Sequence, residues 1–305
     1  MGDPAGGPPR AAVPIYYSSA YVSAKHEFDT TRKAAWVAAS LVSEPIRGTE
    51  LVEPALLSDA DLLLAHDTAY VDSLRTGDPP ALASSSGFGW DPGVWPMARA
   101  SNGGAVAAAL DALASGGIAG SLSSGLHHAK RGRGEGFCTV NGLAIAARRA
   151  IAAGAGRILV LDLDAHCGGG TADILRGDPR IVSVDIAVAP YDVYVAPPGW
   201  SLDHVRDVSG YLPMLRGRLE ALDPSTIDLV LYNAGMDPHE DCDVGGLRGM
   251  TLGILSEREW TVFDWVRRHR LPTAFVLAGG YVGDRLPQRT LVALHRMTIG
   301  AAADG

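Results

Sequence analysis

The chain has 305 residues, of which 47% are hydrophobic and 20% charged, a composition typical of a globular protein that can bury a large core. Its formal net charge of −8 and the lack of a broad basic face argue against nucleic acid as the main partner, and no apolar run reaches the ~20 residues of a membrane span. Three unpatterned cysteines favour a reducing, cytoplasmic compartment over a disulfide framework.

The first half of the chain predicts a tail followed by mixed elements. Residues 1–11 are rich in glycine and proline and lack the apolar segment of a signal peptide, so we expect a disordered tail. After it we predict a strand at 12–17, helices at 29–42, 59–65, 68–74 and 98–113, and a strand at 118–123. The long loop 76–96 carries Phe88, Trp90 and Trp95. Such loops often line a binding mouth, although packing of these aromatic side chains onto the domain is an equally good interpretation.

The second half alternates strands and helices more strictly. We predict helices at 141–153, 204–222, 256–269 and 284–299, and strands at 157–164, 181–185, 227–233 and 273–278. Strands separated by helices indicate parallel βαβ units with right-handed crossovers. No linker divides the chain, so the sequence predicts a single-domain α/β protein whose mainly parallel sheet is sandwiched by helices.

The stretch 160–171 leads from a buried strand directly into metal-ligand chemistry. An apolar run is followed by Asp162, Asp164 and His166 at every second position, which puts all three side chains on one face if the strand stays extended. Two carboxylates and an imidazole suit a divalent metal such as zinc and leave positions open for water and substrate. After the glycines that follow, Thr171 suits the N-cap of a short helix. The alternative is an ordinary strand, loop and helix with solvated acids.

Unusual polar residues follow four of the predicted strands. They are His127-His128, the stretch from Asp162 to His166, Asp237 and Tyr281. The carboxyl ends of parallel strands share one edge of the sheet, so these groups can meet in one crevice. Asp237 would then complete an Asp-His-Asp ligand set. Taken singly, each residue also has a structural interpretation as a core histidine, a turn aspartate or a packed rim tyrosine.

Together, these residues resemble the zinc-dependent histone deacetylases of the arginase/deacetylase fold. The resemblance is closest to the class IV branch and to bacterial histone deacetylase-like amidohydrolases, and it implies a deacetylase domain over residues 12–305. The matching segments are Gly125-Leu126-His127-His128-Ala129, Gly136-Phe137-Cys138, residues 162–166, Tyr232-Asn233-Ala234-Gly235-Met236-Asp237, Gly245-Gly246-Leu247 and Gly279-Gly280-Tyr281.

The resemblance implies two metal ions of different kinds. Asp164, His166 and Asp237 would hold one catalytic zinc ion, which lowers the pKa of its water toward ~7. A structural potassium ion would lie near Asp162.

It also implies the catalytic side chains. His128 would act as general base on the zinc-bound water, and His127 would assist as an electrostatic or acid partner that leans on Asp162. Tyr281 would polarise the amide carbonyl and stabilise the oxyanion.

The implied substrate is an N-acyl-lysine side chain or a related N-acylated amine, in a narrow tunnel. Gly136 and Phe137 would form one wall of this tunnel. The opposite wall would come from residues 189–195, with Tyr191 and Tyr194 as alternatives. The acyl group would be acetyl or longer, and the sequence leaves its length and the oligomeric state open.

One position departs from the family. The family usually has Asp or Asn where this chain has Gly169, and that side chain supports the second tandem histidine. We therefore expect His128 to lack a supporting carboxylate, and we expect Gly169→Asp to supply one and to move the acid limb of kcat/KM to higher pH.

Two other classes of protein compete with this interpretation. A ureohydrolase of the arginase branch needs a second metal, but Cys167-Gly168 and Pro238-His239 stand where its additional acids would be. A low-turnover module that binds acyl-lysine or zinc would be motivated by Gly169. The presence of all three metal-ligand candidates together with Tyr281 argues against such a module.

Overall fold

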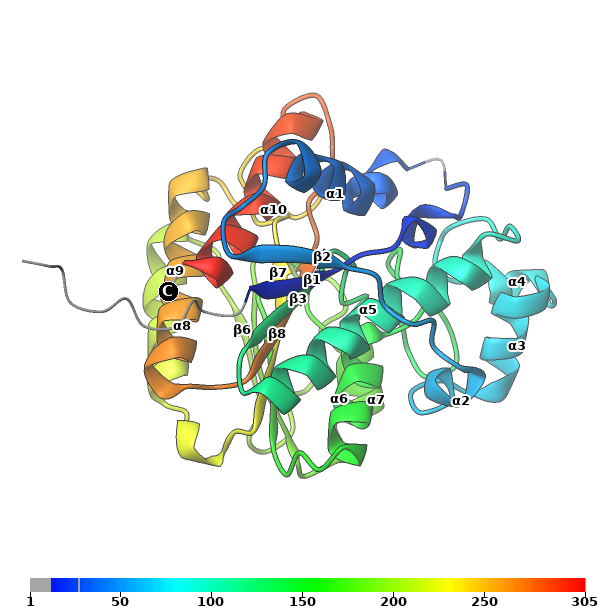
Figure 1. Ribbon diagram of the computed structural model, residues 1–305, viewed down its shortest axis with the longest axis horizontal. Coiled ribbons are helices and arrows are strands. Elements are labelled where there is room, and N and C mark those ends of the chain that lie inside the picture. The colour runs from blue at the N-terminus through cyan, green and yellow to red at the C-terminus, as the bar shows by residue number, and fades with distance from the viewer. Residues whose placement is uncertain (1–11, 27, 305) are drawn as a thin grey trace, which may run out of the picture.

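The computed structural model describes residues 12–26 and 28–304, and these form one eight-stranded sheet with helices on both faces (Figure 1). The strands are β1 Val13–Tyr16, β2 Thr49–Val52, β3 Ile118–Ser121, β4 Ile158–Asp162, β5 Ile181–Ala187, β6 Ser201–His204, β7 Leu229–Gly235 and β8 Thr273–Ala278. They lie in the order β2-β1-β3-β8-β7-β4-β5-β6, and each pairing is parallel. This confirms the predicted fold class.

Two helical layers cover the sheet (Figure 1). The layer on one face consists of α1 Lys33–Ser43, α8 Tyr211–Glu220, α9 Leu252–His269 and α10 Gln288–Ala303. The other face carries α5 Val94–Ser115, α6 Gly142–Ala152 and α7 Gly169–Leu175, with the short helices α2 Asp59–Leu62, α3 Thr68–Thr76 and α4 Pro80–Ala83 beyond α5. Short 3-10 turns are η1 Ser19–Val22, η2 Asp29–Arg32, η3 Val208–Gly210 and η4 Pro224–Thr226.

The inner strands of the sheet position the site. β4, β5, β7 and β8 are buried along their whole length, which explains their unbroken apolar runs, because helices cover both of their faces. The register sets Asp162 at the end of β4 beside Asn233 of β7 and Asp185 of β5. A row of buried polar groups therefore crosses the carboxyl edge of the sheet.

The sequence prediction missed both edge strands. β2 and β6 have only four residues each and are partly exposed, so neither shows the alternation that marks a half-buried strand. His204, predicted to begin a helix, ends β6 instead. α8 begins only at Tyr211, and Pro213 lies in its first turn, where the missing backbone N–H costs no helical hydrogen bond.

The predicted extended strand through 164 is too long. β4 ends at Asp162, and the chain then bends, so the alternation does not continue to His166. The next helix also differs from the prediction. α7 begins at Gly169 with Gly168 as its N-cap, and Thr171 lies inside it, where its backbone N–H donates to His127 O over 2.9 Å.

Other predictions concern the termini and the compartment. The predicted disordered tail, residues 1–11, lies outside the described residues, and the domain boundaries stay a prediction. Within the ranges 12–26 and 28–304, no helix combines the length and the apolar character that crossing a membrane requires. Cys138, Cys167 and Cys242 are buried free thiols, as expected for a chain without a disulfide framework.

Candidate metal centre and its histidine pair

Three ligand-type side chains converge at the carboxyl edge of the sheet. Asp164 and His166 lie in the bend after β4, and Asp237 follows β7. All three residues are buried, and their ligand atoms lie within 4.8 Å of one another. His166 Nδ1 is 3.2 Å from Asp164 Oδ1 and 3.1 Å from Asp237 Oδ2. The structure thus brings together the three predicted zinc ligands, which we call the metal side of the site.

The electrostatics of this group fit a divalent cation. Burial and the neighbouring Asp164 raise the pKa of Asp237 to about 6. Burial lowers the pKa of His166, but the hydrogen bonds and charges of Asp164 and Asp237 outweigh burial and raise it to about 10. Despite its 3.1 Å approach to His166, Asp237 Oδ2 makes no well-directed hydrogen bond to the described residues and keeps a lone pair for a cation. Two carboxylates and one imidazole nitrogen suit zinc.

A glycine behind the metal side makes its close packing possible. Gly279, directly after β8, has φ +52°, and a Cβ there would overlap Asp237 Oδ1. Its carbonyl oxygen accepts a 2.6 Å hydrogen bond from Nζ of the buried Lys33. Burial lowers the pKa of Lys33 to about 8, against the opposing charges of Asp237 and Asp164.

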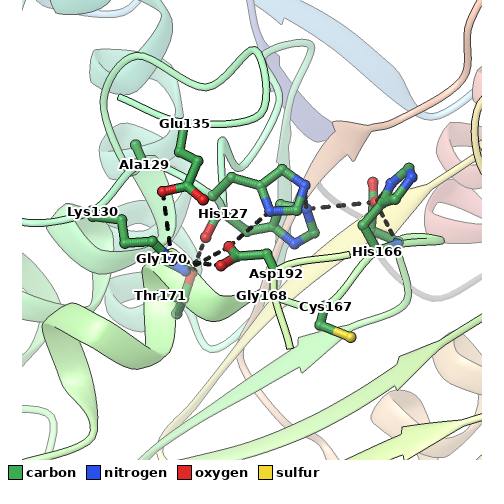
Figure 2. A network of polar contacts seen from close by, with 12 residues as sticks. His127, Ala129, Lys130, Glu135, His166, Cys167, Gly168, Gly170, Thr171 and Asp192 are labelled. Carbon is green, nitrogen blue, oxygen red and sulfur yellow. Dashed lines mark hydrogen bonds and ion pairs between the residues drawn. The ribbon is translucent and has the colours of Figure 1, made fainter. Parts of the chain in front are cut away.

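The tandem histidines His127 and His128, which we call the histidine side, lie next to the metal side. His127 Nε2 is 3.5 Å from Asp164 Oδ1, and the rings of His128 and His166 are 5.8 Å apart; His127 and His166 are labelled in Figure 2. His127 Nδ1 lies 2.8 Å from Asp162 Oδ2, and His128 Nδ1 lies 3.0 Å from Asp192 Oδ2. The two Nε2 atoms are 3.1 Å apart. Leu126, with φ 55°, breaks the extended path just before the pair, so two successive side chains can face the same way.

The surroundings of His127 and His128 shift the pKa values of their imidazoles in opposite directions. Burial lowers the pKa of His127, but the charges of Asp162 and Asp164 outweigh burial and raise it to about 10. Burial and then the charge of His127 lower the pKa of His128 to about 4, although Asp192 acts in the opposite direction. A cationic imidazole beside a neutral one is the arrangement that general acid and base catalysis requires.

The prediction that His128 lacks a supporting carboxylate is wrong. Asp192, in the loop of residues 188–200 between β5 and β6, supplies it. The structure also removes the reason for Gly169→Asp, because a Cβ at Gly169 would overlap both Oδ1 and the backbone carbonyl oxygen of Asp192. The space that a side chain at position 169 would need is already filled by this loop.

A pocket with aromatic walls leads to the histidine side. Its lining includes Phe28, Phe88, Phe137 and Tyr281. The ring centroids of Phe28 lie 5.4 Å from Tyr281 and 5.5 Å from Phe137. The lining also includes Tyr21, Lys33, Met97, Ser101 and Leu122. Burial and the charges of Asp237 and Asp164 raise the pKa of Tyr281 well above its usual value, so its phenol stays a hydrogen-bond donor.

The three aromatic residues of the long loop have different surroundings. Phe88 lines the pocket, whereas the Trp90 indole donates to Leu74 O over 2.8 Å. Trp95 packs under the guanidinium groups of Arg75 and Arg99. Both interpretations of this loop therefore apply, each to different side chains.

The two tyrosine alternatives for the tunnel also separate. The Tyr191 ring lies 4.9 Å from that of His128, and a Cβ at Gly136 would lie 3.0 Å from it. Tyr191 thus faces the Gly136-Phe137 segment across the histidine side. Tyr194 lies elsewhere, since its ring packs edge-on against Trp200 and it is near enough to the buried Asp185 to affect the pKa of that carboxyl.

Sequence reasoning missed several residues that hold the histidine side. His66, which is buried, donates from Nδ1 to Lys130 O over 2.9 Å and accepts from the backbone N–H of Asn141 over 2.9 Å. Asn141 Nδ2 donates to His127 O and to Ala129 O. The sequence did indicate Asn141, because it stands at the start of a predicted helix, and it is the N-cap of α6. Nothing in the sequence near His66 indicates its role.

Most of the chain is similar to proteins of one family. A family model described as histone deacetylase domain matches residues 26–199. An uncharacterised protein of Picosynechococcus is 33% identical, over 95% of this chain and 98% of its own length. Histone deacetylase 2 of Arabidopsis thaliana is 30% identical, over 90% of this chain and 76% of its own length. A probable deacetylase of Methanothermobacter thermautotrophicus is 29% identical, over 80% of this chain.

Solved structures share the fold. An acetylpolyamine aminohydrolase from Burkholderia pseudomallei has a TM-score of 0.79 at 21% identity, covering 95% of this chain and 98% of its own. The HDA15 HD domain has a TM-score of 0.78 at 18% identity, covering 96% of this chain and 90% of its own. At these identities the likeness concerns the architecture, including the parallel sheet whose carboxyl edge carries the site.

Proposed function

This chain belongs to the histone deacetylase domain family, and from that premise we propose that it is a zinc-dependent amidohydrolase. The proposed substrate is an N-acyl-lysine side chain or a related N-acylated amine, from which the enzyme removes an acetyl or longer acyl group. The observation that supports this most strongly is that the metal side and the paired histidines meet at one aromatic-walled pocket. Assignment to the class IV branch stays a prediction.

The roles proposed for the histidines follow from their protonation. Asp164, His166 and Asp237 would hold a zinc ion, which would act as a Lewis acid and lower the pKa of a bound water molecule. The neutral His128 accepts a proton from the attacking water at Nε2, because its Nδ1 is engaged by Asp192. The cationic His127 donates a proton to the departing amine.

Tyr281 and the pocket walls complete the proposal. The Tyr281 phenol donates a hydrogen bond to the amide oxygen as negative charge develops there. Phe137 and Tyr191 flank the lysine stem, with Gly136 giving the loop a close approach to His128. The part of the pocket lined by Tyr21, Met97 and Leu122 would receive the acyl chain.

The potassium ion predicted near Asp162 stays part of the proposal. Asp162 Oδ1 accepts a 2.8 Å hydrogen bond from Asn233 Nδ2, and the neighbouring Asp185 keeps Oδ1 without a hydrogen-bond partner among the described residues. Burial and then the charge of Asp162 raise the pKa of Asp185 well above its usual value. A cation bound near Asp162 and Asp185 would lower the free-energy cost of having both carboxyl groups ionised.

The proposed function is tested with a substrate panel. Zinc-loaded protein is incubated with lysine peptides that carry acetyl, butyryl, octanoyl and myristoyl groups, and with acetylated polyamines, and the released carboxylate is measured. We expect hydrolysis of at least one class, loss of activity with a chelator and recovery with zinc. Folded protein with one zinc ion per chain that hydrolyses none of these amides would refute the proposal.

The competing classes gain no support from the structure. The reason to consider a low-turnover binding module was the missing carboxylate at position 169, and Asp192 removes it. A ureohydrolase needs a second metal, and among the described residues Asp164, His166 and Asp237 are the one group of three or more metal-ligand side chains that converge.

A further inference from the structure

The two tandem histidines are supported in the same way from different parts of the chain. In each, Nδ1 faces a carboxylate, the two Nε2 atoms lie 3.1 Å apart, and both side chains line the pocket. The partner of His127 is Asp162, at the end of β4 in the middle of the sheet. The partner of His128 is Asp192, in the loop 188–200 between β5 and β6, which is labelled in Figure 2. No general pattern of strand ends would place an acid there.

Asp192 is held by three donors. Its Oδ2 lies 3.0 Å from His128 Nδ1 and 3.1 Å from the backbone nitrogen of Gly170, and its Oδ1 forms a 2.5 Å ion pair with Lys130 Nζ. The side chain is only 6% exposed. Burial raises the pKa of Asp192, but the hydrogen bonds and charges of His128 and Lys130 outweigh burial and lower it. The carboxylate is thus ionised and fixed in direction.

The backbone is shaped to bring this carboxylate in. Asp192 has φ 57°, a left-handed conformation that aspartate tolerates better than most residues. Gly169 lets the loop reach the histidine side, because a Cβ at 169 would overlap both the side chain and the carbonyl oxygen of Asp192. The absence of a side chain at 169 and the presence of an acid at 192 are therefore two parts of one arrangement.

The same loop is tied to the metal side. The backbone nitrogen of Val188 donates to Ala165 O over 2.9 Å, and that of Cys167 donates to Tyr191 O over 3.0 Å. Ala165 and Cys167 flank the metal-ligand candidate His166. The distance between Asp192 and the metal side is consequently set by main-chain hydrogen bonds.

We propose that Asp192 is the positioning residue of His128, holding its Nδ1–H and so presenting Nε2 to the pocket as a proton acceptor. The inference rests on the proposed function and assigns Asp192 a task that its family would give to position 169. Tyr191, one residue earlier and proposed above to flank the substrate, packs edge-on against the His128 ring, with the centroids 4.9 Å apart. The wall beside the substrate and the support of the base therefore belong to one loop, and a change in this loop alters both.

Kinetics of Asp192→Ala and Asp192→Asn test the proposal. Losing a carboxylate that orients a site histidine typically costs about 10- to 100-fold in activity. We expect Asp192→Ala to lower kcat by that amount, with KM and zinc content close to those of the wild type. Asp192→Asn should recover part of the loss, because its amide oxygen still accepts from His128. If Asp192→Ala does not fold, Asp192→Asn alone carries the test, with a kcat between those of the wild type and His128→Ala.

Asp203 offers a matched control. It is also a largely buried aspartate, and Arg218 binds both of its oxygens at 2.7 and 2.6 Å on β6, away from the pocket. Asp203→Asn should keep the kcat of the wild type. A folded, zinc-loaded Asp192→Ala enzyme with unchanged kcat, or an equal loss in Asp203→Asn, would overturn the assignment.

A second readout does not depend on turnover. In metal-free protein with ¹⁵N-labelled histidine, we expect a downfield Nδ1–H proton resonance from His128, identified by its absence in His128→Gln. It should disappear in Asp192→Ala and persist in Asp203→Asn. Its persistence in Asp192→Ala would overturn the inference. A wild-type protein that shows this resonance but hydrolyses no amide would refute the proposed function and leave the pairing of His128 with Asp192 supported.

Discussion

The metal side and the histidine side of the site are built by different means. Asp164 and Asp237 directly follow β4 and β7, two adjacent strands whose ends are tied together by the fully buried Arg258. This arginine donates to Leu163 O over 3.1 Å and to Gly235 O over 2.7 Å. The metal side thus takes its geometry from the sheet, and it gathers two negative charges that need a cation.

The histidine side depends on more distant parts of the chain. His127 and His128 lie in an irregular segment after β3, and besides Asp162 at the end of β4 their supports are His66, Asn141 and Asp192. These contacts are hydrogen bonds to backbone groups and ring nitrogens rather than strand pairing. Substitutions on the metal side should therefore remove the bound ion, whereas substitutions on the histidine side should disturb the orientation of the imidazole rings.

The largest expected effect is on the metal side. Asp237→Asn removes a charged ligand, so zinc content should fall from one ion per chain to a small fraction, and kcat should fall by roughly 10³-fold or more, because a Lewis acid supplies several kcal/mol. Elemental analysis and the substrate panel measure both quantities. Asp162→Asn, on the histidine side, is the matched control and should keep its zinc. Equal loss of zinc in the two variants would show that the sides are not separate, and two manganese ions in active wild-type protein would contradict a single zinc site.

A smaller effect is expected where the two sides face the same substrate atom. Tyr281→Phe keeps the ring and removes one oxyanion donor, so kcat should fall by about 10²-fold while zinc content and KM change little. Tyr16→Phe is the control. Tyr16 lies on β1, and its hydroxyl donates a hydrogen bond to Asp111 of α5. If Tyr281→Phe turns over at the rate of the wild type, the tyrosine is only a rim residue.

The smallest effect concerns a support of the histidine side and appears in stability. Burial lowers the pKa of His66 to about 4 from its ordinary 6.5, so below pH 6.5 the unfolded chain takes up a proton that the folded protein refuses. Stability is therefore lost as pH falls from about 6.5 to 4, by roughly 3 kcal/mol from this group. His66→Gln cannot titrate, and its free energy of unfolding should fall less over that window.

Urea unfolding of metal-free wild type and His66→Gln at pH 7.5, 5.5 and 4.5 measures this difference, since the other titrating groups act on both proteins alike. Parallel losses in the two proteins would mean that His66 does not stay neutral in the folded state. The histidine side would then lack the pH-sensitive support that distinguishes it from the metal side.

The sequence predicted the metal side better than the histidine side. The fold class and the convergence of Asp164, His166 and Asp237 were predictable, because buried apolar runs mark inner strands and ligands at the ends of adjacent parallel strands must meet. The supports Asp192 and His66 were not predictable, since each lies 64 residues from its partner, His128 and Lys130 respectively. Only tertiary packing reveals that the loop 188–200 fills the space above Gly169.

The predicted bounds of several strands were wrong for local reasons. The short, exposed strands β2 and β6 carry too few apolar residues to show a period. β4 ends two residues early because Asp164 and His166 turn toward Asp237, which the alternation in the sequence does not encode.

The strand order has a consequence for the time at which the site forms during synthesis. β8, the last strand to be made, lies between β3 and β7, so it joins the group β2-β1-β3 to the group β7-β4-β5-β6. The tandem histidines follow the first group and the metal ligands follow the second. A nascent chain that has not yet released residues 273–278 from the ribosome can pair strands within each group but cannot connect the two. Assembly of the candidate site therefore has to wait for the synthesis of β8, and the hydrophobic edges of β3 and β7 stay exposed to chaperones until then.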